Sequence, residues 1–239
     1  MSIYACSDLH GQKSLLEQII NFLGPNDKVY FLGDAADRGP DGWEMIKMIA
    51  KDSRFVYLKG NHEDMLAAAA KEYFLFDHLG SDYHLLLNNG GYDTFNAMLA
   101  DPMAEKWIAY IRNLPTYAIY NNAIGDSVCL SHAGFTPWID EEGALYVPED
   151  EDLIWNRNHY LEKWNDKEML TNAIVVHGHT PIPYIMDDLR VPDNGDLIAA
   201  GPFWYADSHK VCLDCAAFAT GAAFLLNLDT FEYHTFKSE

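Results

Sequence analysis

The feature that most restricts the fold is an alternation of short apolar runs with helical patterns in the first third of the chain. Residues 3–7 form an apolar run that is typical of a buried strand, and apolar residues at helical spacing follow it until Gly24 and Pro25. The same order recurs further along, which predicts an α/β architecture with partly parallel strands. In chain order the predicted elements are strand 3–7, helix 15–23, strand 29–32, helix 43–49, strand 55–58 and helix 65–70.

The rest of the chain predicts a mixed sheet. Residues 67–115 are mostly helical in pattern, and the apolar runs 116–120 and 128–131 are joined by a polar turn that suits a hairpin. Segment 140–164 predicts loop and short helix, and segment 181–206 predicts a long excursion or an extra hairpin. Further strands are predicted at 174–176, 211–213 and 223–228. Because no linker or repeat interrupts this pattern, a single domain over residues 1–239 is expected.

Polar residues beside a glycine follow five of the apolar strands. Each stretch supplies Asp, Asn or His directly after the strand ends. The stretches are Asp8 to Gly11, Gly33 to Gly39, Gly60 to Glu63, His132 to Gly134 and His177 to Thr180. Ligand sites in α/β sheets form beyond the carboxyl ends of the strands, so these stretches are expected to converge on one centre.

The chemical types of these side chains indicate a metal site. Asp, His and Asn are oxygen and nitrogen ligands that suit Mn, Fe or Zn better than a thiolate site would. Asp8 and His10 are separated by one residue, so both can point the same way from an extended strand end. Taken alone, each stretch has a plainer explanation: a surface Asp–His pair, Asn61 as a helix N-cap, or His132 as a hydrogen-bonded core residue. All five strand ends together favour the metal centre.

The charge balance excludes several classes of partner. The chain has 16 Lys and Arg against 36 Asp and Glu, a net charge of −20, which opposes binding to nucleic acid or to an anionic membrane. No apolar run approaches the ~20 residues of a membrane-spanning helix, and the first residues lack the basic region of a signal peptide. The four scattered cysteines do not suggest a disulfide framework. A reducing, cytoplasmic location is therefore expected.

The strand-end stretches together resemble the signature of the PPP-type metallophosphoesterases. That family includes serine/threonine protein phosphatases, phage-type protein phosphatases and symmetrical diadenosine tetraphosphatases. The match runs from Asp8 to His179, and one departure is Ser7, where the family usually has glycine. The resemblance implies a calcineurin-like sandwich of mixed β-sheets flanked by helices.

The resemblance also implies two divalent metal ions, with Mn favoured and Fe or Zn as alternatives. Asp8 and His10 would hold the first ion, and Asp34 would bridge both ions. The second ion would be held by Asn61, His132 and His179. The alternative histidine, His177, would be a strand residue whose role is left open.

Four further residues receive roles from the same resemblance. His62 would be the general acid that protonates the leaving oxygen, and Asp37 would orient it. Arg38 and Arg157 would bind the substrate phosphate together with Asn61; Arg157 is included because Leu153 to Arg157 resembles a phage-type stretch whose arginine holds phosphate.

The implied activity is that of a metal-dependent phosphomonoesterase acting on phosphorylated protein, most closely a serine/threonine phosphatase, or on a small phosphoester. This substrate is favoured because the chain has few cations to hold a long polyphosphate, and an acidic stretch from Asp140 to Asp152 would attract basic peptide side chains. A symmetrical dinucleoside tetraphosphate hydrolase is the alternative. A non-catalytic binding module is a remote alternative, because none of the implied ligands is missing.

Overall fold

The computed structural model describes residues 1–76, 78–139, 145–161, 172–190 and 201–238 of the chain. Its described part contains two five-stranded mixed sheets and one small hairpin. The first sheet has the order β12-β11-β1-β2-β3, and the second has the order β4-β5-β8-β10-β9. The strands of the first sheet are β1 (Ile3–Cys6), β2 (Lys28–Phe31), β3 (Phe55–Tyr57), β11 (Ala222–Asn227) and β12 (Tyr233–Lys237). Those of the second are β4 (Tyr117–Asn121), β5 (Ser127–Ser131), β8 (Ala173–His177), β9 (Phe203–Tyr205) and β10 (Lys210–Cys212).

The two sheets face each other across an apolar layer. In β1, Ile3 and Ala5 point into this layer, whereas Tyr4 and Cys6 point to the helices on the other face. This alternation follows from the two-residue period of a strand, and burial on both faces explains why β1 is continuously apolar. The second sheet contributes side chains such as Val128 to the same layer.

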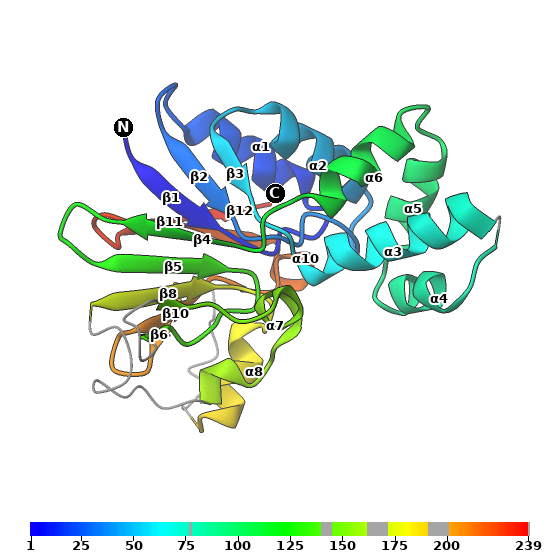
Figure 1. The fold of residues 1–239 in the computed structure, drawn as a ribbon. Coiled ribbons are helices and arrows are strands. Elements are labelled where there is room, and N and C mark those ends of the chain that lie inside the picture. Colours follow the sequence, from blue (N-terminus) through cyan, green and yellow to red (C-terminus); the bar gives the residue numbers. More distant parts are fainter. Residues whose placement is uncertain (77, 140–144, 162–171, 191–200, 239) are drawn as a thin grey trace.

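Helices cover the outer faces of the sandwich (Figure 1). Helices α1 (Lys13–Phe22) and α2 (Gly42–Lys51) bury apolar stripes against the first sheet, as their sequence spacing predicts. Helix α8 (Ile182–Asp188) packs against the second sheet. Helix α7 (Asp150–Trp155) and the short helix η1 (His159–Leu161) lie in the connection from β7 to β8, and α10 (Ala217–Thr220) precedes β11.

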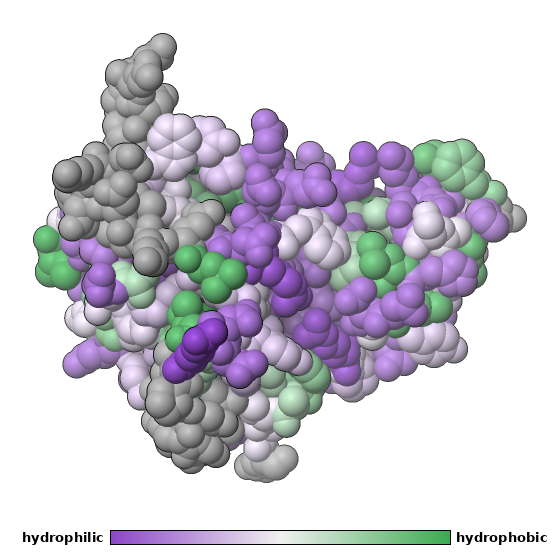
Figure 2. Space-filling model, turned by 90° about the horizontal axis from the view of Figure 1, so that it is seen from below, coloured by the Kyte–Doolittle hydropathy of each residue, from purple (hydrophilic) through white to green (hydrophobic). Residues whose placement is uncertain are grey.

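Four helices between β3 and β4 form a separate lobe beside the sandwich (Figure 1). They are α3 (Asn61–Phe76), α4 (Ser81–Asn88), α5 (Tyr92–Leu99) and α6 (Ala104–Arg112). Hydrophobic side chains gather at the far end of this lobe, at the right of Figure 2, where Leu75, Phe76 and Leu79 are exposed. The amino end of α3 reaches the centre of the molecule, and it carries Asn61 and His62.

The structure confirms the predicted fold class and most of the predicted elements. Strands β1, β2 and β3 pair in parallel, and β4 and β5 form the expected antiparallel hairpin. In the predicted 181–206 excursion, β9 pairs antiparallel with β10; residues 191–200 lie outside the described part of the chain. Residues 140–144 and 162–171 of the predicted acidic loop region also lie outside it.

Three strands were missed by the sequence analysis. Strands β6 (Trp138–Ile139) and β7 (Leu145–Tyr146) have two residues each, which is too short for a periodic signal. Strand β12 is a largely exposed edge strand without the apolar alternation of a buried one. A search of the described helices finds none that is both long enough and apolar enough to cross a bilayer.

Candidate metal centre and active site

The strand ends that carry the predicted ligands meet in the middle of the molecule (Figure 1). Their backbone is unusual, because Asp8, His10, Asp34 and His179 all have positive φ angles, between 44° and 66°. This left-handed conformation is unfavourable for side chains other than glycine and persists where the surroundings enforce it. The turns also pack tightly: a Cβ on Gly33 would lie 2.4 Å from the backbone nitrogen of Gly60. Glycine at this position lets the ends of β2 and β3 approach each other.

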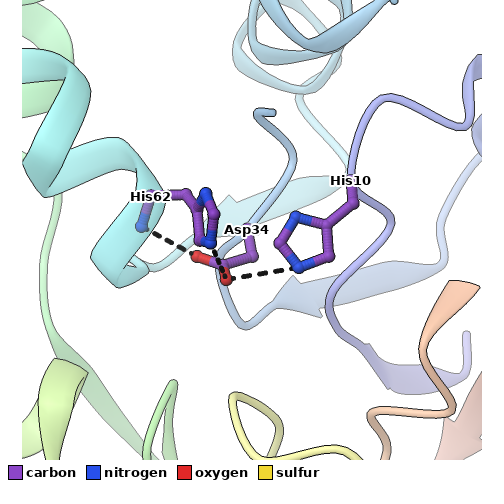
Figure 3. Close-up of side chains that lie close together, drawn as sticks. All are labelled: His10, Asp34 and His62. Carbon is purple, nitrogen blue, oxygen red and sulfur yellow. Dashed lines mark hydrogen bonds and ion pairs between the residues drawn. The ribbon is translucent and has the colours of Figure 1, made fainter. Parts of the chain in front are cut away.

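The first sheet brings together Asp8, His10, Asp34 and His62, all of which are buried. His10 Nε2 lies 3.6 Å from Asp34 Oδ2 and 3.9 Å from Asp8 Oδ1. Figure 3 shows His10 and His62 on opposite sides of the Asp34 carboxylate, with His62 Nε2 3.8 Å from Asp34 Oδ2. The carboxylate of Asp34 therefore lies at the centre of this group.

A second group forms on the other side of Asp34. His132 Nε2 lies 3.4 Å from Asp34 Oδ1 and 2.9 Å from Asn61 Oδ1. His179 Nδ1 lies 2.9 Å from Asn61 Oδ1 and 3.1 Å from His132 Nε2. The two groups thus share Asp34, and together they contain all six predicted metal ligands.

The hydrogen bonds of two histidines show which ring nitrogens face the centre as acceptors. His10 Nδ1 donates to the carbonyl oxygen of Ala36 at 3.0 Å, and His132 Nδ1 donates to that of Leu32 at 2.8 Å. A carbonyl can only accept, so the neutral rings keep the lone pairs of Nε2 directed at the carboxylates.

This donor set fits divalent cations. Carboxylate oxygens, an amide oxygen and imidazole nitrogens converge within 2.9 to 3.9 Å of one another. Ligand atoms about 2.1 Å from one ion lie about 3 Å apart, which is close to the spacing in the second group. Among the described residues, two groups of His and Asp satisfy a search for metal-binding clusters, namely His10–Asp34–His62 and Asp8–Asp34–His132.

The raised pKa of the central carboxylate, Asp34, shows that its ionised form is unfavourable unless a positive charge lies nearby. Burial raises the pKa of Asp34 well above its usual value, and the neighbouring carboxylates of Asp8 and Glu63 raise it further. Burial lowers the pKa of His132 to about 3, so its ring is neutral at physiological pH and can act as a ligand. A cation between the groups would keep both aspartates ionised.

His62 lies between the carboxylate of Asp37 and the guanidinium of Arg38, at the edge of the first group. Its Nδ1 donates to Asp37 Oδ2 at 2.7 Å, and its Nε2 accepts a hydrogen bond from Arg38 Nη2 at 3.1 Å. His62 and Asp37 are fully buried, whereas the guanidinium of Arg38 belongs to an exposed residue. The predicted partnership of His62 with Asp37 is thus present as a direct contact.

The two remaining predicted residues lie on the side of the second sheet. Arg157 is exposed; burial is the main cause that lowers the pKa values of His132 and His179, and the positive charge of Arg157 is a smaller contribution in the same direction. His177 ends β8 and does not join the second group; its Nε2 contacts the hydroxyl of Tyr205 at 2.7 Å. Its Nδ1 donates to the carbonyl oxygen of Gly178 at 2.9 Å, so it braces the turn that carries His179.

Sequence reasoning missed the role of Glu63. This buried carboxylate accepts hydrogen bonds from the backbone nitrogens of Asp34 at 2.8 Å and Gly60 at 2.9 Å, and from the hydroxyl of Tyr57 at 2.8 Å. It also accepts from the backbone nitrogen of Ala35 at 3.0 Å. Glu63 therefore ties the turn after β2 to the turn after β3. Its place in the Gly-Asn-His-Glu stretch, next to ligand-type residues, was the available signal in the sequence.

Comparison with known proteins defines the class to which this fold and site belong. A model of the calcineurin-like phosphoesterases matches residues 1–202, and the chain belongs to that family. Among curated proteins, it is 31% identical over 196 residues to a symmetrical bis(5'-nucleosyl)-tetraphosphatase of Nitrosococcus oceani, covering 80% of this chain and 60% of that protein. A protein of the same name from Delftia acidovorans is 27% identical over 148 residues, covering 59% of this chain and 48% of that protein. The chain thus spans about half the length of the curated relatives it matches.

A solved structure extends the likeness of the fold. A serine/threonine protein phosphatase from Saccharomyces cerevisiae superimposes with a TM-score of 0.58 at 15% identity, covering 100% of this chain and 80% of that one. At this level of identity the likeness concerns the fold alone, which is shared by phosphatases of different specificity.

Proposed function

We propose that this protein is a metal-dependent phosphohydrolase whose active site is the cluster centred on Asp34. The observation that carries the proposal is the convergence of Asp8, His10, Asn61, His132 and His179 on that carboxylate, with the His62–Asp37 pair beside it. Two bound divalent cations, Mn²⁺ being the favoured one, would supply an activated water and neutralise phosphate oxygens.

Each predicted residue of the site then has a defined role. Asp34 would hold both ions, Asp8 and His10 would complete the first site, and three residues would complete the second: Asn61, His132 and His179. In its imidazolium form, protonated from solvent, His62 would give the Nε2 proton to the leaving oxygen and become the neutral ring that accepts from Arg38, while Asp37 accepts from its Nδ1–H and so fixes the ring. Arg38, Arg157 and Asn61 bind the phosphate oxygens.

For the substrate, we propose a symmetrical dinucleoside tetraphosphate. The support comes from the curated relatives, which carry that activity in their names, and from two exposed arginines near opposite groups of the cluster. The expectation of a phosphoprotein substrate receives no support from these relatives.

A serine/threonine phosphatase activity is kept as the second candidate because of one surface feature. A cavity of about 310 Å³ adjoins the start of α3, and its charged lining is three carboxylates, Asp64, Asp150 and Glu151, against one cation, Lys59. An acidic groove beside the site would attract the basic side chains of a peptide and would repel a second phosphate chain.

The deciding experiment compares substrates on one preparation. The protein loaded with Mn²⁺ is given diadenosine tetraphosphate, a phosphoserine peptide and a phosphotyrosine peptide at equal salt. We expect kcat/KM for the dinucleotide to exceed both peptides by more than tenfold, about 1.4 kcal/mol in transition-state binding. A phosphoserine peptide that wins by that margin replaces the first proposal with the second, and no hydrolysis of any substrate overturns both.

Three further expectations remain part of this proposal. The chain is taken to act as one catalytic domain over residues 1–239 in a reducing cytoplasm, without nucleic acid or membrane partners. Its four cysteines are free and buried, which agrees with that location.

A further inference from the structure

We propose that Phe218 is a positioning residue for Arg38: its ring holds the guanidinium over the His10–His62 side of the cluster, where a substrate phosphate would bind. The proposal rests on the proposed function for the identity of that ligand. Neither the strand-end pattern nor the family resemblance involves Phe218, which lies 180 positions along the chain from Arg38.

Three contacts place Arg38 between two parts of the molecule. Its Cζ atom lies 4.8 Å from the centroid of the Phe218 ring, and its Nη2 donates to His62 Nε2 at 3.1 Å. The Phe218 ring in turn meets the His10 ring edge-on, with centroids 5.8 Å apart. Because the His10 and His62 rings are themselves 4.7 Å apart, the guanidinium and the Phe218 ring lie at the rim of the first metal group.

The turn that carries Phe218 is held in an unfavourable conformation. Ala216 has a φ of 57° and Gly221 a φ of 63°, so the short helix α10 begins and ends with left-handed residues. Alanine adopts this conformation only under constraint. The constraint is visible here: Asp214 Oδ1 accepts from the backbone nitrogen of Ala216 at 2.8 Å, and the Asp214 side chain is buried. The fold therefore fixes the place from which Phe218 projects.

Packing alone does not account for an aromatic ring at this position. Phe218 is 43% exposed, so much of its apolar surface remains in contact with water. A guanidinium over an aromatic face is an attractive arrangement that leucine or alanine cannot provide.

The Phe218 ring can hold Arg38 at a stage of the reaction when His62, the other side chain that contacts the guanidinium, binds the leaving oxygen instead. The backbone of Arg38 is fixed, with its nitrogen donating to the carbonyl oxygen of Gly90 at 3.0 Å, but its long side chain has many rotamers. During the proposed reaction, His62 Nε2 turns its hydrogen-bonding capacity to the leaving oxygen. Phe218 is then the contact that continues to orient the guanidinium toward the phosphate.

The test measures the affinity of Mn²⁺-loaded protein for inorganic phosphate by titration calorimetry. Phe218→Leu should weaken phosphate binding about two- to fivefold, the range expected for a cation–π contact near the surface. Phe218→Trp should retain the wild-type affinity, which separates loss of the aromatic face from damage to the turn. Phe74→Leu is the matched control, because Phe74 is 38% exposed and lies about 20 Å along α3 from Asn61.

A double-mutant cycle then asks whether Phe218 acts through Arg38. In an Arg38→Ala background, Phe218→Leu should cause no further loss of phosphate affinity. Unchanged affinity in Phe218→Leu, or an equal loss with and without Arg38, would overturn the proposal. Failure of the proposed function would be seen in a different measurement: the wild-type protein would bind phosphate but would hydrolyse no phosphoester.

Discussion

The ends of the first sheet and those of the second contribute to one site in different ways. The first sheet supplies both carboxylates and the His62–Asp37 pair, from turns with left-handed backbone that Glu63 ties together. The second sheet supplies the neutral imidazoles: His132 directly follows β5, and His179 lies two residues beyond the end of β8. One half of the site is thus anionic and held by a local hydrogen-bond network, and the other is neutral and held by strand pairing.

Several hydrogen bonds join the two halves: the backbone nitrogen of His179 donates to Asp8 Oδ2 at 3.1 Å, and both His132 and His179 contact Asn61 Oδ1. His132 Nδ1 donates to the carbonyl oxygen of Leu32, which belongs to the turn after β2 in the opposite sheet. The comparison therefore teaches that the two imidazoles of the second half are oriented partly by groups that belong to the first half. The following predictions test this division.

Removal of metal should have the largest effect, because both halves lose their common partner. Chelated protein, with metal loss verified by elemental analysis, should lose hydrolysis of an aryl phosphate and regain it when Mn²⁺ is added. Protein that goes through the same treatment without chelator serves as the control for damage to the fold. Full activity in verified metal-free protein would contradict the role given to both halves.

His132→Ala should separate the halves. The second group loses a ligand that contacts both Asp34 and Asn61, whereas Asp8 and His10 are untouched. Bound metal should fall from about two ions to about one per chain, with hydrolysis strongly reduced. His177→Ala is the comparison variant, and it should keep both ions, because His177 is not a member of the second group. Loss of both ions in His132→Ala would mean that the first sheet cannot hold its ion alone.

His62→Asn should reduce catalysis while sparing metal binding. Removing the proton donor is expected to lower kcat by about 10²–10⁴ for a poor leaving group and by less for a good one. The measurement is kcat for an alkyl and an aryl phosphate, with metal content determined on the same samples. Metal loss in this variant would instead make His62 a ligand of the first group, as its place near Asp34 allows.

Glu63→Gln should show that the first half depends on its network for stability. An amide group would direct a donor at backbone N–H groups that now bind a carboxylate oxygen, so the free energy of unfolding should fall by about 2–3 kcal/mol. Chemical denaturation of the apo protein measures it. Glu17→Gln, on the exposed face of α1, is the control and should change stability by about 0.5 kcal/mol or less. Equal effects of the two substitutions would remove the distinction between the halves.

Arg157→Ala should have the smallest effect of the five. If its charge binds phosphate beside the second group, kcat/KM falls about tenfold and inhibition by inorganic phosphate weakens with it. Arg157→Lys should recover only part, because an ammonium cannot reproduce the planar fork of the guanidinium. Unchanged kinetics in both variants would leave Arg157 as a surface residue near His132 and His179.

The sequence by itself determined those strands and helices whose pattern is set by residues close together in the chain. The two-residue alternation of β1 and the helical spacing of α1 and α2 are local patterns, and the structure follows them. The residue types at the strand ends also predicted which side chains could meet, because parallel strands deliver their carboxyl ends to one edge.

Only the tertiary structure decided how those side chains are held. Glu63 reaches back to the turn after β2, His132 is oriented by Leu32, and Phe218 lies against Arg38. Contacts between residues so far apart in the chain leave no period in the sequence, and each depends on tertiary packing: neighbouring strands of one sheet for Glu63, and the two sheets against each other for His132. The sequence therefore determined the chemistry available to the site, and the folded chain determined its orientation, because direction in space arises only when distant segments pack together.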